Sequence, residues 1–125
     1  MLRTYASWGA VLMLLAVALG AFGAHGLKTK IDADLLAAYE TGVHYHIAHA
    51  LGLILIGLVA DKLGESKLVR LSAAFIVAGI VLFSGSLYVM AVTDIRMLGI
   101  VTPFGGVSFL AGWALLAAGV RKRGR

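Results

Sequence analysis

The sequence contains no cysteine, a single proline and few charged residues. Without cysteine the chain can form no disulfide, no thiolate metal site and no cysteine nucleophile. Charged residues make up 14% of the 125 residues and hydrophobic residues 61%, against roughly 45–50% apolar in a soluble domain. This composition excludes a water-soluble fold and a disordered or collagen-like chain. It indicates that lipid surrounds most of the chain.

Long uncharged runs fill most of the sequence, and four of them are long enough to cross a membrane. At about 1.5 Å per residue, roughly 20 helical residues span a hydrocarbon core about 30 Å thick. The runs predict spans at about residues 4–24, 42–60, 71–93 and 103–120. The sequence therefore predicts an all-α integral membrane protein, a single domain over residues 1–125 built as an antiparallel bundle of four transmembrane helices.

The start of the fourth span is predicted from Thr102 and Pro103. Thr102 can cap a helix, and Pro103 suits the first helical position because its missing N–H would be unpaired there anyway. Gly105 and Gly106 follow at once, so residues 102–106 are predicted to form a helix cap and turn. Residues 94–101 then form the preceding loop.

A short additional helix is predicted between the first two spans. Asp32 can cap a helix in which Leu35, Leu36 and Tyr39 fall on one side. That pattern is typical of a helix lying in the membrane interface, where it would link the spans or cover the outer end of the bundle.

Basic residues are divided unequally between the two ends of the predicted bundle. One side holds both termini and the middle loop, with Arg3, Lys62, Lys67, Arg70, Arg121, Lys122, Arg123 and Arg125, and the other holds Lys28, Lys30 and Arg96. Because Lys and Arg are retained on the cytoplasmic side, both termini are predicted to be cytoplasmic. A cleaved signal peptide fits less well, because the first apolar run exceeds the usual length of roughly 7–15 residues.

The net charge of +5 comes mostly from the C-terminal tail. A nucleic-acid site needs a basic stripe with base-reading or stacking groups beside it, so nucleic acid is not an expected partner. A basic tail next to a span instead contacts anionic lipid head groups, at about 1 kcal/mol for each charge near the surface. The predicted head-group contacts are Arg121, Lys122, Arg123 and Arg125.

Small residues recur at four-residue spacing in every span, a pattern that marks helix contact faces in membranes. Tight packing within the bundle accounts for these faces. A monomer of this size has little interior, however, so a homo-oligomer is the predicted state. The faces comprise Ala16, Gly20 and Ala24 in the first span, Ala48 and Gly52 in the second, Ala74 and Ala78 in the third, and Ser108 and Gly112 in the fourth.

All four histidines lie where the first span ends and the second begins. His46 and His49 are three residues apart on one helix, and antiparallel packing brings His25 to the same level. Imidazoles with a carboxylate such as Glu40 would suit zinc, copper or iron, and paired histidines would suit a haem. His25, His46 and His49 are therefore a candidate metal set, while the cofactor, including none, stays open.

The alternative interpretation of the histidines is structural. His49 lies about 9 Å past Val43 toward the membrane midplane, where a polar group needs a partner such as Tyr45 or a neighbouring helix. No set of catalytic acid, base and nucleophile can be assembled from the chain, so no catalytic residue is predicted. The predicted polar core consists of Tyr45, Glu40, Ser84, Ser86 and Tyr88.

Four ordered motifs carry a resemblance to a known family: residues 20–27 (GAFGAHGL), residues 40–51 (ETGVHYHIAHAL), residues 83–88 (FSGSLY), and residues 102–106 (TPFGG) followed by Gly112 and Trp113. The chain resembles the small bacterial membrane proteins grouped as domain of unknown function 423, whose eukaryotic relatives are called transmembrane protein 256-like. The resemblance implies an inner-membrane location and no established activity. The family pattern falls on His25, Tyr45, His49, Ser84, Ser86, Tyr88 and Pro103, which favours a core of His25, Tyr45 and His49.

Three functional classes remain open on the sequence. The leading hypothesis is a structural or accessory membrane protein of unknown activity, in which a His/Tyr cluster joins the outer ends of the first two spans. The second is a metal-binding, haem-binding or redox-accessory protein, because the histidines cluster. The third is a channel or carrier for protons or a small solute, because His49 is buried in a span.

Overall fold

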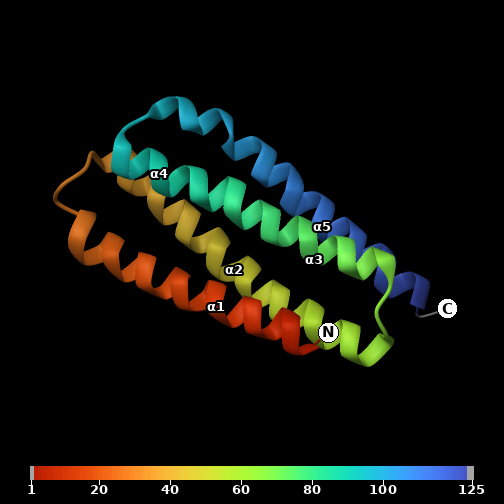
Figure 1. Cartoon of the computed structure of the whole chain (residues 1–125). Coiled ribbons are helices and arrows are strands. Elements are labelled where there is room, and N and C mark those ends of the chain that lie inside the picture. Colours follow the sequence, from red (N-terminus) through yellow and green to blue (C-terminus); the bar gives the residue numbers. More distant parts are fainter. Residues whose placement is uncertain (1, 124–125) are drawn as a thin grey trace.

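A computed structural model of the chain describes residues 2–123, and they form an antiparallel bundle of four long helical segments (Figure 1). The first segment is α1 (Leu2–Phe22), continued by the π-helical turn η1 (Gly23–Leu27), and the second is α2 (Ala33–Leu63). The third runs through α3 (Lys67–Gly79), the π-helical turn η2 (Ile80–Ser84) and α4 (Gly85–Thr93). The fourth contains the 3₁₀ turn η3 (Arg96–Ile100) and α5 (Thr102–Arg123).

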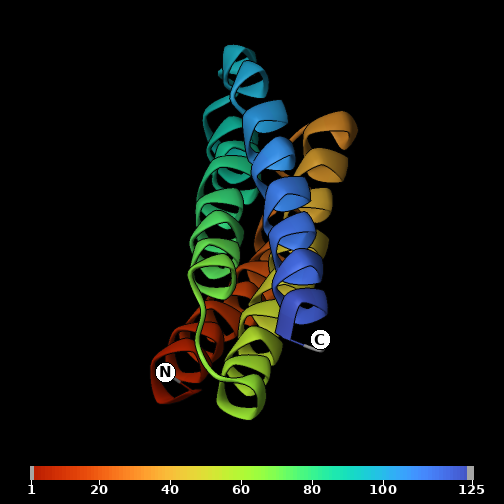
Figure 2. The same ribbon diagram turned by 90° about the vertical axis from the view of Figure 1, so that its right-hand side faces the viewer.

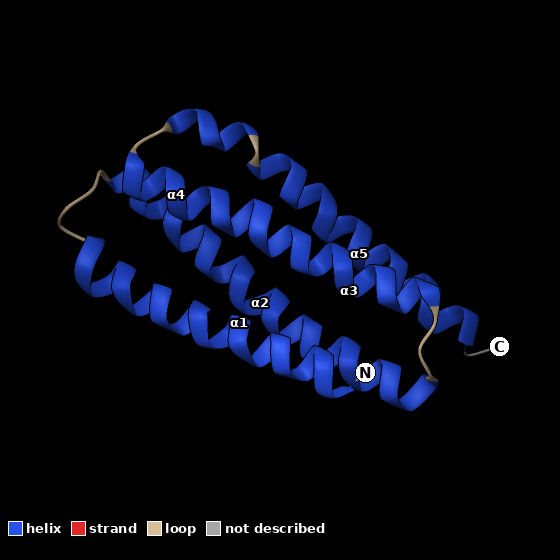
Figure 3. Cartoon of the chain, in the orientation of Figure 1, coloured by secondary structure: helices blue, strands red, loops and turns tan. Residues whose placement is uncertain are grey.

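Each of the four segments is long and apolar enough to cross a membrane. Short loops join them (Figure 3), and both termini lie at the same end of the bundle as the α2–α3 link (Figures 1 and 2). The predicted all-α class and the four-helix architecture are therefore confirmed.

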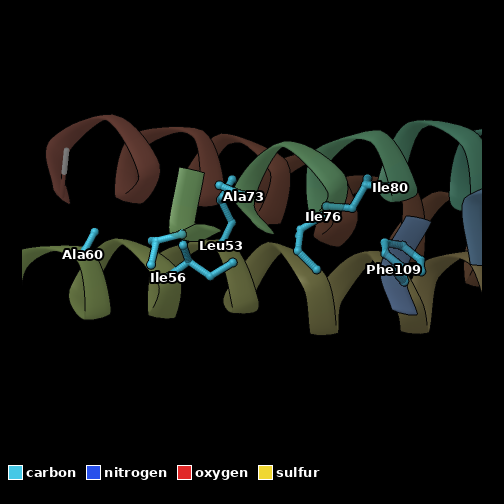
Figure 4. Close-up of a cluster of buried hydrophobic side chains, with 8 residues drawn as sticks. Leu53, Ile56, Ala60, Ala73, Ile76, Ile80 and Phe109 are labelled. Carbon is cyan, nitrogen blue, oxygen red and sulfur yellow. The ribbon is translucent and has the colours of Figure 1, made fainter. Parts of the chain in front are cut away.

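The helix α2 is the central element of the bundle. It is the most buried of the four segments, α1 packs mainly on it, and α3 packs mainly on α5. The largest core cluster joins α2, α3, η2 and α5 (Figure 4). Since lipid is as apolar as these side chains, close packing rather than escape from water holds them together. The cluster consists of Leu53, Ile56, Ala60, Val69, Ala73, Ile76, Ile80 and Phe109.

The structure differs from the sequence-based expectation between the first two predicted spans. Residues 33–41 are helical, but they are the first turns of α2 and not a separate helix in the membrane interface. Leu35 and Tyr39 are buried in a second core cluster with Leu27 and Ala91. The apolar stripe therefore packs against the bundle, and nothing in this stretch breaks the helix before the span begins.

The segment 94–101, predicted as a loop, also contains regular structure, because residues 96–100 form a 3₁₀ turn. Asp94 adopts the left-handed conformation, with φ of 58°, and its N–H donates to the carbonyl of Met90 to close α4. The 3₁₀ turn η3 follows, and its Arg96 is paired with Asp34 at 2.6 Å, Asp94 at 3.1 Å and Asp32 at 3.5 Å. These exposed ion pairs attach η3 to the start of α2.

Two π-helical turns interrupt the first and third segments in the half of the bundle away from the termini. In η2, the extra residue of the wider turn brings the backbone at Phe83 against α5, and Gly105 lies at the closest approach. A Cβ at Gly105 would collide with the backbone of Phe83, so only glycine fits there without movement. Gly105 and Gly106 are therefore helical residues of α5 and not an irregular turn, and of the two only Gly105 makes room for η2.

Candidate functional site

The four histidines are not equivalent. His25 in η1 and His44 in α2 are exposed, whereas His46 and His49 in α2 are buried, with 3% and 6% of their surfaces exposed. The two buried rings have different neighbours. Three residues along an α-helix leave their side-chain directions about 60° apart, so the two rings can face different helices. The candidate site therefore divides into a His49 cluster against α5 and a His46 cluster against α4.

His49 has a hydrogen-bond partner on each ring nitrogen. Its Nδ1 lies 2.7 Å from the carbonyl oxygen of Tyr45, one turn earlier in α2, and the indole Nε1–H of Trp113 donates to its Nε2 at 2.9 Å. The imidazole also stacks on Phe109, with ring centroids 3.6 Å apart and planes 15° apart. The ring is thus held by its own helix and by α5.

This pattern determines the chemical state of His49. A carbonyl only accepts and an indole N–H only donates, so Nδ1 carries the proton and Nε2 provides the lone pair. The ring is neutral and its only lone pair on nitrogen accepts from Trp113. His49 therefore has no free nitrogen with which to bind a metal or a haem iron.

His46 belongs to a second polar cluster between α2 and α4. Its Nδ1 lies 2.8 Å from the hydroxyl of Tyr88, while Nε2 is buried and makes no hydrogen bond of ordinary geometry. The direction of the bond with Tyr88 depends on the tautomer of the ring, because a hydroxyl can either donate or accept.

Two serines connect the third segment to its neighbours. The hydroxyl of Ser84 donates to the carbonyl oxygen of Gly42 at 2.7 Å, across the α2–η2 contact. Ser86 donates to the carbonyl of Phe83 at 2.9 Å and lies 2.6 Å from the hydroxyl of Thr102 at the start of α5. These bonds join α2, the third segment and α5 in the half of the bundle away from the termini.

The remaining predicted site residues lie elsewhere. Tyr45 is 46% exposed and stacks its ring parallel to His49, with centroids 6.0 Å apart. Glu40 is exposed beside His44 at a small cavity of about 150 Å³ near the end of the bundle away from the termini. Pro103 stands in the first turn of α5. Within residues 2–123, no three His, Asp or Glu side chains gather as a metal site, so His25, His46 and His49 are not brought together.

Sequence reasoning missed two members of the site. Trp113, the hydrogen-bond donor to His49, is 64 residues away in the chain. Tyr39 is 1% exposed, and its hydroxyl donates to the carbonyl of Leu19 at 2.5 Å, which ties α2 to α1. A buried Tyr usually needs a partner for its hydroxyl, and that rule was the available signal for Tyr39. Trp113 is 39% exposed, so burial gave no such signal for it.

A shallow pocket of about 500 Å³ lies over the His49 cluster on the side of the bundle. Aromatic rings form most of its floor: Tyr45 and Phe83 have centroids 4.6 Å apart, and Phe83 and Phe109 have centroids 5.6 Å apart. Pro103 and Trp113 complete the wall at the α5 side. The pocket is apolar and lies on the lateral surface, where acyl chains surround a membrane-spanning bundle.

Four apolar helices, connected by short loops and joined by interhelical polar contacts, define a small helical integral membrane protein. The comparisons with known proteins assign it to a particular group. Residues 19–106 match the family described as "Protein of unknown function (DUF423)", and the chain belongs to that family.

Relatives with curated names support both the class and the family. The UPF0382 membrane protein YwdK of Bacillus subtilis is 47% identical over 121 residues, 97% of this chain and 98% of the relative. The UPF0382 membrane protein SSP2132 of Staphylococcus saprophyticus is 41% identical over 121 residues, 97% of this chain and 99% of the relative. The UPF0382 inner membrane protein YgdD of Escherichia coli K12 is 47% identical over 104 residues, 82% of this chain and 78% of the relative. No solved structure matches the chain.

Proposed function

We propose that this protein is a structural or accessory component of the membrane in which His49 and its partners hold the outer half of the bundle together. The observation that carries the proposal is the complete use of the two His49 nitrogens by Tyr45 and Trp113. A ring held in one tautomer by two partners is suited to fixing helix positions. It is poorly suited to exchanging a ligand.

Neither alternative functional class is favoured. Metal or haem ligation would require His49 to give up its bond from Trp113, which would leave the indole N–H without that partner. A proton or solute pathway would need polar groups along the helices. The buried serines of the third segment, Ser72, Ser84 and Ser86, donate instead to backbone carbonyls of this bundle.

The proposed location is the bacterial cytoplasmic membrane, with both termini in the cytoplasm. The name of the E. coli relative contains the words inner membrane, which supports the location. The orientation is supported by the charges at the two ends of the bundle, because the basic residues Arg3, Lys62, Lys67, Arg70, Arg121 and Lys122 lie at the end with the termini. The outer end combines three basic residues with a cluster of three aspartates around Arg96.

Two partner proposals follow from that orientation. Arg121 and Lys122 are exposed at the end of α5, where they would meet anionic head groups of the inner leaflet, while Arg125 lies outside the described residues. A homo-oligomer remains proposed because much of the surface of α1 and α5 is uncovered within one chain. Analytical ultracentrifugation in mild detergent would test the oligomer, since a monomeric mass would contradict it.

The structural role is tested by comparing two histidines of the same helix. Replacing His49 with Ala removes both interhelical and stacking contacts and leaves the Trp113 N–H unpaired, so we expect a loss of about 1–3 kcal/mol in unfolding free energy. The matched control is His44→Ala. His44 lies five residues earlier in the same helix and is exposed, so the expected change is within about 0.5 kcal/mol. Thermal unfolding in detergent measures both, and equal melting of the His49→Ala variant and the unmodified chain would contradict the proposal.

A further inference from the structure

A lateral groove opens between α1 and α3 in the half of the bundle that holds the two termini. Its volume is about 650 Å³, within the roughly 300–1,000 Å³ range of small-ligand pockets. Trp8 of α1, Leu53 of α2, and Ala74 and Ala78 of α3 line it. The groove exists because α1 packs mainly on α2 and leaves the adjoining face of α3 uncovered.

The wall on α3 is made of small apolar residues. Ala74 and Ala78 are one turn apart, and the lining extends along α3 from Arg70 to Ala78, a rise of about 12 Å. Other predicted small-residue faces are used inside the bundle: Gly52 lies against Trp113 and Gly112 against Ile76. The α3 face thus forms an open apolar channel of the length and shape that part of an acyl chain can fill.

One end of the groove carries a positive charge. Arg70 lines it in the first turns of α3, is exposed, and makes no ion pair with the residues described, 2–123. Glu65 lies at the same end, and it accepts a hydrogen bond of 3.1 Å from the hydroxyl of Tyr5. The planar guanidinium of Arg70 therefore offers its donors at the mouth of the groove, in the geometry that suits a phosphate.

The surroundings of Arg70 match a lipid interface. Tyr5 and Trp8 line the groove next to it, and Tyr and Trp are the residues that gather at the head-group level of membranes. Trp8 is 60% exposed, which places its ring in contact with whatever occupies the groove. An occupant with one apolar part and one anionic part complements all of these features.

We propose that the α1–α3 groove binds a phospholipid with an anionic head group, one acyl chain lying along Ala74 and Ala78 and the phosphate pairing with Arg70. A second copy of the chain is the competing occupant. A second copy seated in this groove would set Arg70 against a basic end, with six Lys or Arg side chains and two acidic ones, Asp61 and Glu65, among the described residues. The proposed homo-oligomer can form through the exposed face of α5 without that contact. The lipid is therefore the better complement. The site itself does not depend on the structural role of His49, and only its assignment to the inner leaflet rests on the proposed orientation.

The chain has two tryptophans, and this makes the groove accessible to a direct test. The full-length protein is placed in phosphatidylcholine vesicles that contain a small fraction of brominated phosphatidylglycerol or, separately, the same fraction of brominated phosphatidylcholine. Bromine quenches nearby indole fluorescence. In the Trp8→Phe variant the fluorescence comes from Trp113 alone, in the His49 cluster. Subtracting it from the fluorescence of the unmodified chain gives the Trp8 signal. We expect the anionic lipid to quench Trp8 several times more strongly than the neutral lipid.

Three variants separate the site from general attraction to a basic surface. Arg70→Gln is expected to bring the quenching by the two lipids close to equality, because the charge-assisted pair with the phosphate is lost. Arg3→Gln removes one charge from the same end without touching the groove, and it should leave most of the preference in place. Ala74→Leu keeps every charge but fills the groove, and it should reduce quenching by both lipids.

The results that would overturn the proposal are distinct. Equal quenching of Trp8 by the two lipids would show that no anionic site exists, and an unchanged preference in Arg70→Gln would place the charge elsewhere. A Trp8 protected from both lipids would show that a second copy covers the groove. If Arg70→Gln fails to fold, the Ala74→Leu variant still decides the case, because undiminished quenching in it would contradict binding along α3.

Discussion

Single side chains in this bundle act mainly by joining helices through polar contacts inside an apolar surrounding. His49 joins α2 to α5 through Trp113, Tyr39 joins α2 to α1, and Ser84 joins α2 to η2. Each contact gives a polar side chain a partner that it would otherwise lack among apolar groups. Bonds of this kind between membrane helices average about 0.6 kcal/mol, with a maximum near 1.7. Their role is therefore mainly to fix helix register.

The Tyr88 hydroxyl provides a test at this scale. Replacing Tyr88 with Phe keeps the ring against Tyr39, whose centroid is 5.1 Å away, but removes the partner of His46 Nδ1. Because that buried nitrogen would be left unpaired, we expect unfolding in detergent to become easier by about 0.5–2 kcal/mol. Tyr45→Phe is the control, since its exposed hydroxyl makes no hydrogen bond with the part of the chain that the structure describes. A similar loss in both variants would count against a specific role for the Tyr88 hydroxyl.

The sequence predicts which residues are polar and near the membrane, but not which residues they meet. The four-residue spacing of Tyr45 and His49 correctly places them on one helix face, and their rings stack. The spacing of His46 and His49 also predicts neighbours, yet one ring reaches Tyr88 and the other reaches Trp113. Helical spacing describes one helix only, whereas the partner of a ring depends on how far the neighbouring helices are rotated.

Helix packing in this bundle depends on a few close approaches between elements. The contact between α5 and η2 is the tightest, because the Gly105 backbone lies directly against the Phe83 backbone. The π turn η2 makes this approach by shifting the residues that follow it around the helix axis. A sequence gives no clear signal of a π turn, which is why the spans could be predicted while this contact could not.

Two glycines on either side of this contact are expected to respond in opposite directions. Gly105→Ala forces a Cβ into the Phe83 backbone, so we expect a loss of about 1–3 kcal/mol in unfolding free energy, as overpacked cores show. Gly85, just after η2, has open space around the position of a Cβ, and Gly85→Ala should stabilise the helix by up to about 1 kcal/mol. Denaturation in detergent micelles distinguishes the two variants. A stable Gly105→Ala chain would mean that η2 and α5 do not approach this closely.

Charges set some helix ends in the structure, and packing sets others. The third segment begins at Lys67, four residues before the span expected at residue 71. The start of α2 was expected at about residue 42, but Leu35 and Tyr39 pack into the bundle and extend the helix back to Ala33. An amphipathic helix that lies in the membrane interface has the same sequence pattern as one that continues a span and packs on a neighbouring helix. Only tertiary contacts distinguish the two arrangements.

The whole molecule is electrically asymmetric, and its orientation can be measured because the chain has no cysteine. Single cysteines introduced by Thr29→Cys in the first loop and by Leu63→Cys at the end of α2 leave every basic residue unchanged. With both termini in the cytoplasm, a membrane-impermeant maleimide should label the Thr29→Cys chain in intact spheroplasts and the Leu63→Cys chain only after lysis. The unmodified chain provides the blank. The reverse labelling pattern would invert the proposed topology, and labelling of both variants would indicate dual insertion.

The pairing of helices has a consequence for how the protein is made. α1 packs mainly on α2 and α3 mainly on α5, so each helix finds its principal partner in an adjacent part of the chain. The bundle is thus two helical hairpins joined by residues 64–66. During synthesis the first hairpin can close in the membrane before the second has left the ribosome, and only the docking of the hairpins through α2 must wait for the complete chain.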